Sequence, residues 1–157
     1  MKNYFMYILI FFISTNLYAQ IPQIKTGLYV GVDSNYCKLD QTYFTLNYLS
    51  NVYCFKNKPD ISVEDFDTLA IYPIKINNEA IFSMSIKLTN SATSKFENIT
   101  SNNIGNKIAF IAENKIIMIP TVNGEISSGV ITIQDSEKVI LELEKYLQSE
   151  MKKINAI

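Results

Sequence analysis

Side chains that could do covalent chemistry gather between Gly124 and Gly129 of this 157-residue chain, where Ser127 and Ser128 follow Glu125. A hydrolase built here would need a serine activated by a lysine, or a pair of carboxylates. The chain contains no histidine, the usual general base near neutral pH. Serines are also common in glycine-bounded turns, and no nucleophile-elbow pattern surrounds this pair. We therefore predict a loop and a protein that is not an enzyme; a secreted hydrolase is the least favoured alternative.

An acidic cluster formed by Asp60, Glu64, Asp65 and Asp67 is a second candidate site, for calcium. The cluster lacks the alternating oxygen ligands and the glycine of a calcium loop. Carboxylates are also favoured at a helix start, and Ser62 with Asp65 three residues later has the form of a capping box. We interpret the cluster as structural and expect neither a metal nor a cofactor.

The composition argues against a nucleic-acid partner. All 14 basic residues are lysine, and the formal net charge is −1, so the chain has no excess of positive charge for a phosphate backbone. Without arginine it also lacks the planar fork that binds phosphate or carboxylate at two points. A hydrophobic content of 48% and a charged content of 18% are typical of a folded globular protein.

Residues 1–19 have the pattern of an export signal. Lys2 supplies the positive start, residues 4–13 form an apolar run, and residues 17–19 offer a cleavage site before Gln20. The run is too short to cross a membrane, and the alternative is a buried first helix or strand. We expect an exported bacterial protein, periplasmic or extracellular, with no integral membrane segment after signal removal.

Cys37 and Cys54 are the two cysteines of the chain, and both follow the expected signal. An even number of cysteines in an oxidising compartment favours a disulfide between them. The alternative is a pair of small buried hydrophobic residues.

The remaining sequence predicts strands and two longer helices. Residues 80–88 alternate apolar and polar side chains, as expected of a strand with one wet face, and residues 69–76 pair with them across a polar turn. Apolar residues recur at helical spacing after Thr89 and again after Ser136. Further strands are expected at residues 26–32, 43–49, 51–55, 107–112, 115–119 and 130–133. We predict an α+β fold, a mainly antiparallel β-sheet with two longer helices packed on one face.

Ten positions in the second half of the chain have a recognisable spacing. They are Phe96, Thr100, Asn103, Gly105, Ile108, Ala109, Pro120, Ile126, Gly129 and Ile133. This pattern resembles the head subdomain of the first large periplasmic domain of SecD/SecDF, the membrane-embedded accessory of the general protein translocase. Two departures are Glu113-Asn114, where the family has an Asp-Gly turn, and Asp135, where it has a glycine.

The resemblance implies a stand-alone exported copy of that head. Residues 20–157 would form one domain, with residues 20–59 as an N-terminal β extension and residues 60–150 as the family-like core. We expect no nucleic-acid partner and a non-enzymatic binding or accessory module that contacts protein or peptide segments in the cell envelope. The alternative is an envelope or secreted interaction protein unrelated to translocation.

The expected contact region is the second strand of the 107–119 hairpin and the loop after it. Its candidate residues are Ile117, Ile119, Pro120, Glu125 and Gly129. For each of them, a role in the core or in a turn is the competing interpretation.

Overall fold

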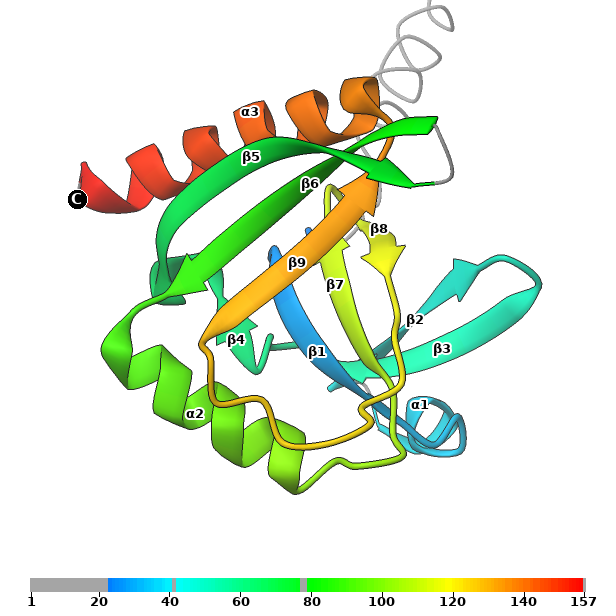
Figure 1. The fold of residues 1–157 in the computed structure, drawn as a ribbon. Coiled ribbons are helices and arrows are strands. Elements are labelled where there is room, and N and C mark those ends of the chain that lie inside the picture. The colour runs from blue at the N-terminus through cyan, green and yellow to red at the C-terminus, as the bar shows by residue number, and fades with distance from the viewer. Residues whose placement is uncertain (1–22, 41, 77–78, 157) are drawn as a thin grey trace, which may run out of the picture.

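The computed structural model describes residues 23–40, 42–76 and 79–156, which form two antiparallel sheets with helices beside them (Figure 1). The first elements are β1 (Gly27–Val32), α1 (Tyr36–Leu39), β2 (Tyr43–Tyr48), β3 (Asn51–Lys56), β4 (Ile61–Ser62) and the 3₁₀ turn η1 (Val63–Asp65). The others are β5 (Phe66–Ile76), β6 (Glu79–Leu88), α2 (Asn90–Ser101), β7 (Ile108–Ala112), β8 (Lys115–Met118), β9 (Val130–Asp135) and α3 (Glu137–Asn155).

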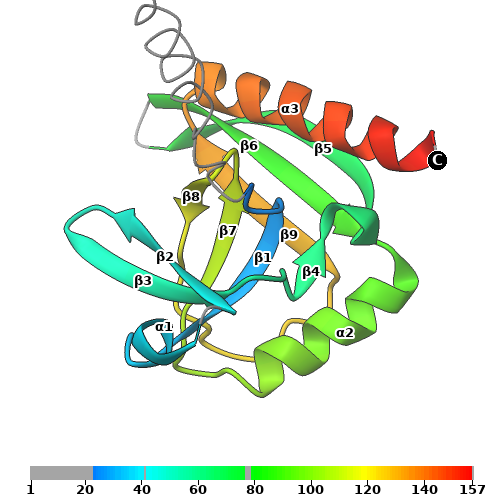
Figure 2. The same cartoon turned by 180° about the vertical axis from the view of Figure 1, so that it is seen from behind.

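The larger sheet has the strand order β2-β3-β1-β7-β8, with β4 also paired to β1, and the smaller sheet has the order β5-β6-β9. Every strand pairing in the described residues is antiparallel. The longer helices α2 and α3 both contact β6 (Figures 1 and 2). This arrangement confirms the predicted α+β fold.

The main core lies between the two sheets and the two longer helices. In β6, Met84, Ile86 and Leu88 are buried while Lys87 is exposed, so the alternation in the sequence sets the inner face. The predicted wet face is wrong at Ser83, which is fully buried. Phe96 of α2 belongs to the same cluster. The other members from β7, β9 and α3 include Phe110, Ile131, Ile133, Ile140, Leu143 and Leu147.

A second apolar cluster lies on the other face of the larger sheet. Tyr29 of β1 is fully buried there, with Phe44 and Phe55 of the β2–β3 hairpin at ring distances of 5.6 Å and 6.1 Å. Because β1 lies between β3 and β7, its alternate side chains serve both clusters. The N-terminal extension therefore contributes a central strand.

Most of the predicted elements are present, with local differences. β2 and β3 form a hairpin, and Ser62 and Asp65 form the predicted capping box, in which the Ser62 N–H donates to Asp65 Oδ2 at 2.8 Å. The four-residue helix α1 was not predicted, because so short a segment has no apolar periodicity. Ser136 occupies the N-cap position of α3 but makes no side-chain capping bond. The expected signal, residues 1–19, lies outside the described residues.

Candidate functional site

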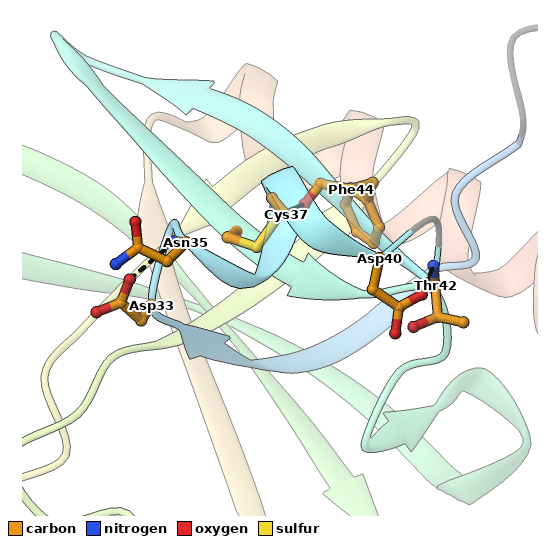
Figure 3. Close-up of a disulfide and its surroundings, with 7 residues drawn as sticks. Asp33, Asn35, Cys37, Asp40, Thr42 and Phe44 are labelled. Atoms are coloured by element: carbon orange, nitrogen blue, oxygen red, sulfur yellow. Dashed lines mark hydrogen bonds between the residues drawn. A yellow bond between two sulfur atoms is a disulfide. The ribbon is translucent and has the colours of Figure 1, made fainter.

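The predicted disulfide is present and joins α1 to the β2–β3 hairpin. Cys37 of α1 bonds to Cys54 of β3 across a Cα–Cα distance of 5.9 Å. Figure 3 shows the turns on either side of α1, where Asp33 Oδ1 accepts from the Asn35 N–H at 2.8 Å. The disulfide and this turn hold α1 against the hairpin.

The acidic cluster has structural partners. Asp60 Oδ2 accepts a hydrogen bond from the Val30 N–H at 2.8 Å, and Asp65 lies 3.8 Å from the ammonium of Lys95. Burial raises the pKa of the Tyr29 hydroxyl above its ordinary value, and the negative charge of Asp60 raises this pKa further. In the described part of the chain, no three His, Cys, Asp or Glu side chains lie close enough together to hold a metal ion.

The predicted hairpin of β7 and β8 turns at Glu113 and Asn114, whose φ angles are +50° and +61°. Left-handed conformations at both central residues are those of a type I′ turn, which favours the twist of paired strands. Asn114 tolerates this conformation, and its Oδ1 accepts from the Ile24 N–H at 2.8 Å. The chain thus keeps the turn where the SecD/SecDF pattern has Asp-Gly.

The chain after the hairpin returns beside the residues that precede it. The Ile108 N–H donates to the Pro120 carbonyl at 3.1 Å, and the Gly105 N–H donates to the Val122 carbonyl at 2.8 Å. Gly105 has a φ of +87°, in the left-handed region that glycine adopts without strain. These contacts bring Gly105 and Pro120 into one region.

Thr100 ties the following loop, residues 119–129, to helix α2. Its side chain is fully buried, and its Oγ1 donates to the Phe96 carbonyl at 3.0 Å and accepts from the Ile126 N–H at 2.9 Å. At the end of the loop, Gly129 has a φ of +62°, and an added Cβ would lie 2.1 Å from Thr93 Oγ1 of α2. A hydroxyl and a glycine therefore let the loop lie directly against the helix.

The five predicted contact residues do not share one exposed surface. Ile117 is half-buried against the main core, Ile119 is half-buried against the second cluster, and Gly129 is buried. Pro120 and Glu125 have exposed side chains. Ser127 and Ser128 are also exposed, and Ser128 Oγ accepts from the Val130 N–H at 3.4 Å, a turn contact.

The tip of the β2–β3 hairpin is a surface that the sequence analysis missed. Leu49 is 87% exposed with a φ of +54°, and Val52 is 62% exposed. The hairpin extends beyond the rest of the fold in both views (Figures 1 and 2). Residues 43–55 contain no charged side chain, and this run, with a leucine at a turn position, is the signal that could have found the tip.

A cleft of about 500 Å³ was also missed, because its walls come from distant parts of the chain. Tyr146 of α3 and Thr26 share a hydrogen bond of 2.8 Å across 120 sequence positions. The charged residues that line the cleft are Lys25, Lys58, Glu64 and Glu150. No local pattern brings these residues together.

The fold and loop geometry agree with a comparison with protein families. The family model for the SecDF P1 head subdomain matches residues 49–150, so the chain belongs to this family. Protein translocase subunit SecD of Rickettsia conorii is 40% identical over 58 residues, which are 36% of this chain and 11% of that protein. The chain therefore matches about a tenth of the length of that relative.

Two solved SecDF structures are similar to the chain. One, described as a membrane component that enhances protein export, has a TM-score of 0.49 and 21% identity over 57% of this chain and 40% of that chain. The other, SecDF in a super-membrane-facing form, has a TM-score of 0.48 and 20% identity over 59% of this chain and 12% of that chain. Among the described helices of the present chain, none combines the length and apolar character needed to span a bilayer.

Proposed function

We propose that this chain is a non-enzymatic accessory module of protein translocation that contacts polypeptide segments in the bacterial cell envelope. The observation that carries the proposal is the match of residues 49–150 to the SecDF P1 head subdomain. The relative from Rickettsia conorii is named a protein translocase subunit, and polypeptides are what a translocase handles. The export pattern of residues 1–19 supports a location outside the cytoplasm.

A rigidly held loop with exposed side chains supports a binding role for the module. The contacts of Thr100 and Gly129 hold the 119–129 loop on α2, while Pro120 and Glu125 remain exposed on it. A loop fixed in this way loses little conformational entropy when a partner binds. We place the contact region at this loop and at the adjoining β9.

A second candidate is an envelope interaction protein unrelated to translocation. The observation that favours it is the hairpin tip. Strand β2 lies outside the family match, and the exposed Leu49 is the first residue of that match. Exposed apolar side chains at a projecting tip are typical of protein contacts.

Photocrosslinking in the native host, combined with cell fractionation, tests both candidates. A photoreactive residue is placed at Glu125 on the loop, at Leu49 on the hairpin tip, or at exposed Glu142 on α3 as the control. We expect envelope fractions to contain the protein, and position 125 to crosslink to exported precursors or to translocase subunits. Crosslinks from position 49 alone, to proteins with no part in export, would favour the second candidate.

A further inference from the structure

The two edges of the smaller sheet differ in their free hydrogen-bonding groups. The Leu88 N–H donates to the Gly129 carbonyl at 2.9 Å, so Leu88 and Gly129 form a hydrogen-bonded pair. In an antiparallel ladder such pairs alternate with non-bonded ones. Ile131 and Ile133 therefore direct their backbone groups to β6, whereas Val130, Thr132 and Gln134 direct theirs outward.

The same alternation shows that the outer edge of β5, the other edge of this sheet, is protected against strand addition. Thr68, Ala70 and Tyr72 lie opposite the β6 residues that face away from β9, so Leu69, Ile71, Pro73 and Lys75 direct their backbone groups outward. Pro73 has no N–H to offer at this edge, and Lys75 is charged and exposed. A proline and a lysine are the usual means of preventing strand addition.

The β9 edge has no such protection. Among the described residues, no strand pairs with its outer side, and no loop or side-chain group bonds to the backbone of Thr132 or Gln134. The five residues from Val130 to Gln134 include neither proline nor a charge, and four of them, Val130, Ile131, Thr132 and Ile133, are β-branched. Figure 1 shows β9 as the last strand of its sheet.

We propose that β9 binds an extended polypeptide segment by strand addition. The free groups are the main-chain donors and acceptors of Thr132 and Gln134, two residues apart, and the ligand with the same spacing of groups is another extended backbone. Such a site recognises the hydrogen-bonding groups of the ligand's main chain more than its side chains. It therefore suits unfolded segments of many different proteins. This inference rests on the proposed function and specifies how the polypeptide is held.

Proline substitution at Thr132 tests the proposal, because Thr132→Pro removes an outward N–H while the ladder to β6 is formed by its neighbours. The matched control is Thr132→Val, which keeps the N–H and the branched shape. The probe is a dye-labelled peptide of alternating valine and threonine with lysine at both ends. A second peptide of the same sequence is N-methylated at consecutive nitrogens, so that neither of its edges can donate backbone hydrogen bonds.

We expect the unmodified peptide to bind wild type and Thr132→Val alike, and to bind Thr132→Pro at least about tenfold more weakly. The N-methylated peptide should lose affinity for wild type by a similar factor. Equal binding of Thr132→Pro, or of the N-methylated peptide, would overturn strand addition at this edge.

Amide hydrogen exchange of the wild-type protein covers the case in which the proline variant does not fold. Addition of the peptide should slow exchange at Thr132 and Gln134, and unchanged exchange would contradict the proposal. If Thr132 and Gln134 exchange slowly without peptide, and this protection disappears when the protein is diluted, a second copy of the chain covers the edge. That result would overturn the proposal. If the host crosslinks from position 125 persist in Thr132→Pro, the proposed function stands while this mode of binding fails.

Discussion

The contact between Gly129 and Thr93 leaves no room for a side chain at position 129. A Cβ at this position would lie 2.1 Å from Thr93 Oγ1, and the φ of +62° would add backbone strain. We expect Gly129→Ala to lower the free energy of unfolding by about 1–3 kcal/mol, measured by urea denaturation. Gly124→Ala is the matched control, since no atom lies within 4 Å of its Cβ position. Equal losses in both variants would contradict the packing role.

Thr100 supplies a buried hydroxyl that the 119–129 loop needs. Thr100→Val keeps the shape of the side chain but leaves the Ile126 N–H without its acceptor. We expect a loss of about 1–3 kcal/mol in unfolding free energy, with faster amide exchange at Ile126. Thr100→Ser retains the hydroxyl and should protect the Ile126 amide as wild type does; faster exchange in this variant would show that the hydroxyl is not the cause.

The residue roles that could be predicted are those with partners close in sequence. Ser62 and Asp65 lie three positions apart, so their capping box was readable. The acceptor role of Thr100 could not be predicted, because its donor, the Ile126 N–H, is 26 positions away in the sequence. The burial of Gly129 was hidden for the same reason, because Thr93 reaches it through the tertiary fold.

At the scale of elements, the Cys37–Cys54 disulfide stabilises the β2–β3 hairpin by closing a loop with a sequence separation of 17. Such a loop contributes about 3 kcal/mol in the chain-entropy account. We expect a reductant to lower the urea midpoint of wild type accordingly. The Cys37→Ala/Cys54→Ala variant should start from the lower midpoint and not respond to reductant; a response would place the effect elsewhere.

Elements with strong periodicity were predicted, and the short elements α1 and β4 were not. The alternation in β6 and the apolar stripe of α3 are local consequences of which face is buried. The helix α1 has four residues, too few to show a period, and is held by a disulfide and by tertiary contacts. The free edge of β9 depends on which strands pair, and single-strand patterns do not contain that information.

At the scale of the whole molecule, the N-terminal extension is part of the fold. β1 contributes buried Leu28 and Tyr29 to two different clusters and pairs with β3, β4 and β7. We expect residues 23–157 to unfold in one cooperative thermal transition, followed by circular dichroism. Residues 60–157 alone should lose that transition, because removal of β1 exposes both clusters. A cooperative transition in the shorter chain would show that the extension is dispensable.

The sequence resemblance predicts an N-terminal extension at residues 20–59, whereas the family match begins at residue 49. The pairing of the extension's strands with the later strands could not be predicted. The sequence of β1 is that of an ordinary short apolar strand, and it contains no signal that predicts pairing with β7. Pairing between distant strands is decided by the packing of the complete chain.

The disulfide also decides what a protease can release from this protein. Cys37 precedes the segment that matches the SecDF head, whereas Cys54 lies within it. A cut at the exposed Leu49 would leave two fragments that migrate together on a non-reducing gel and separate only after reduction. In an oxidising compartment, proteolysis at the hairpin tip would thus open the chain without shedding its N-terminal piece.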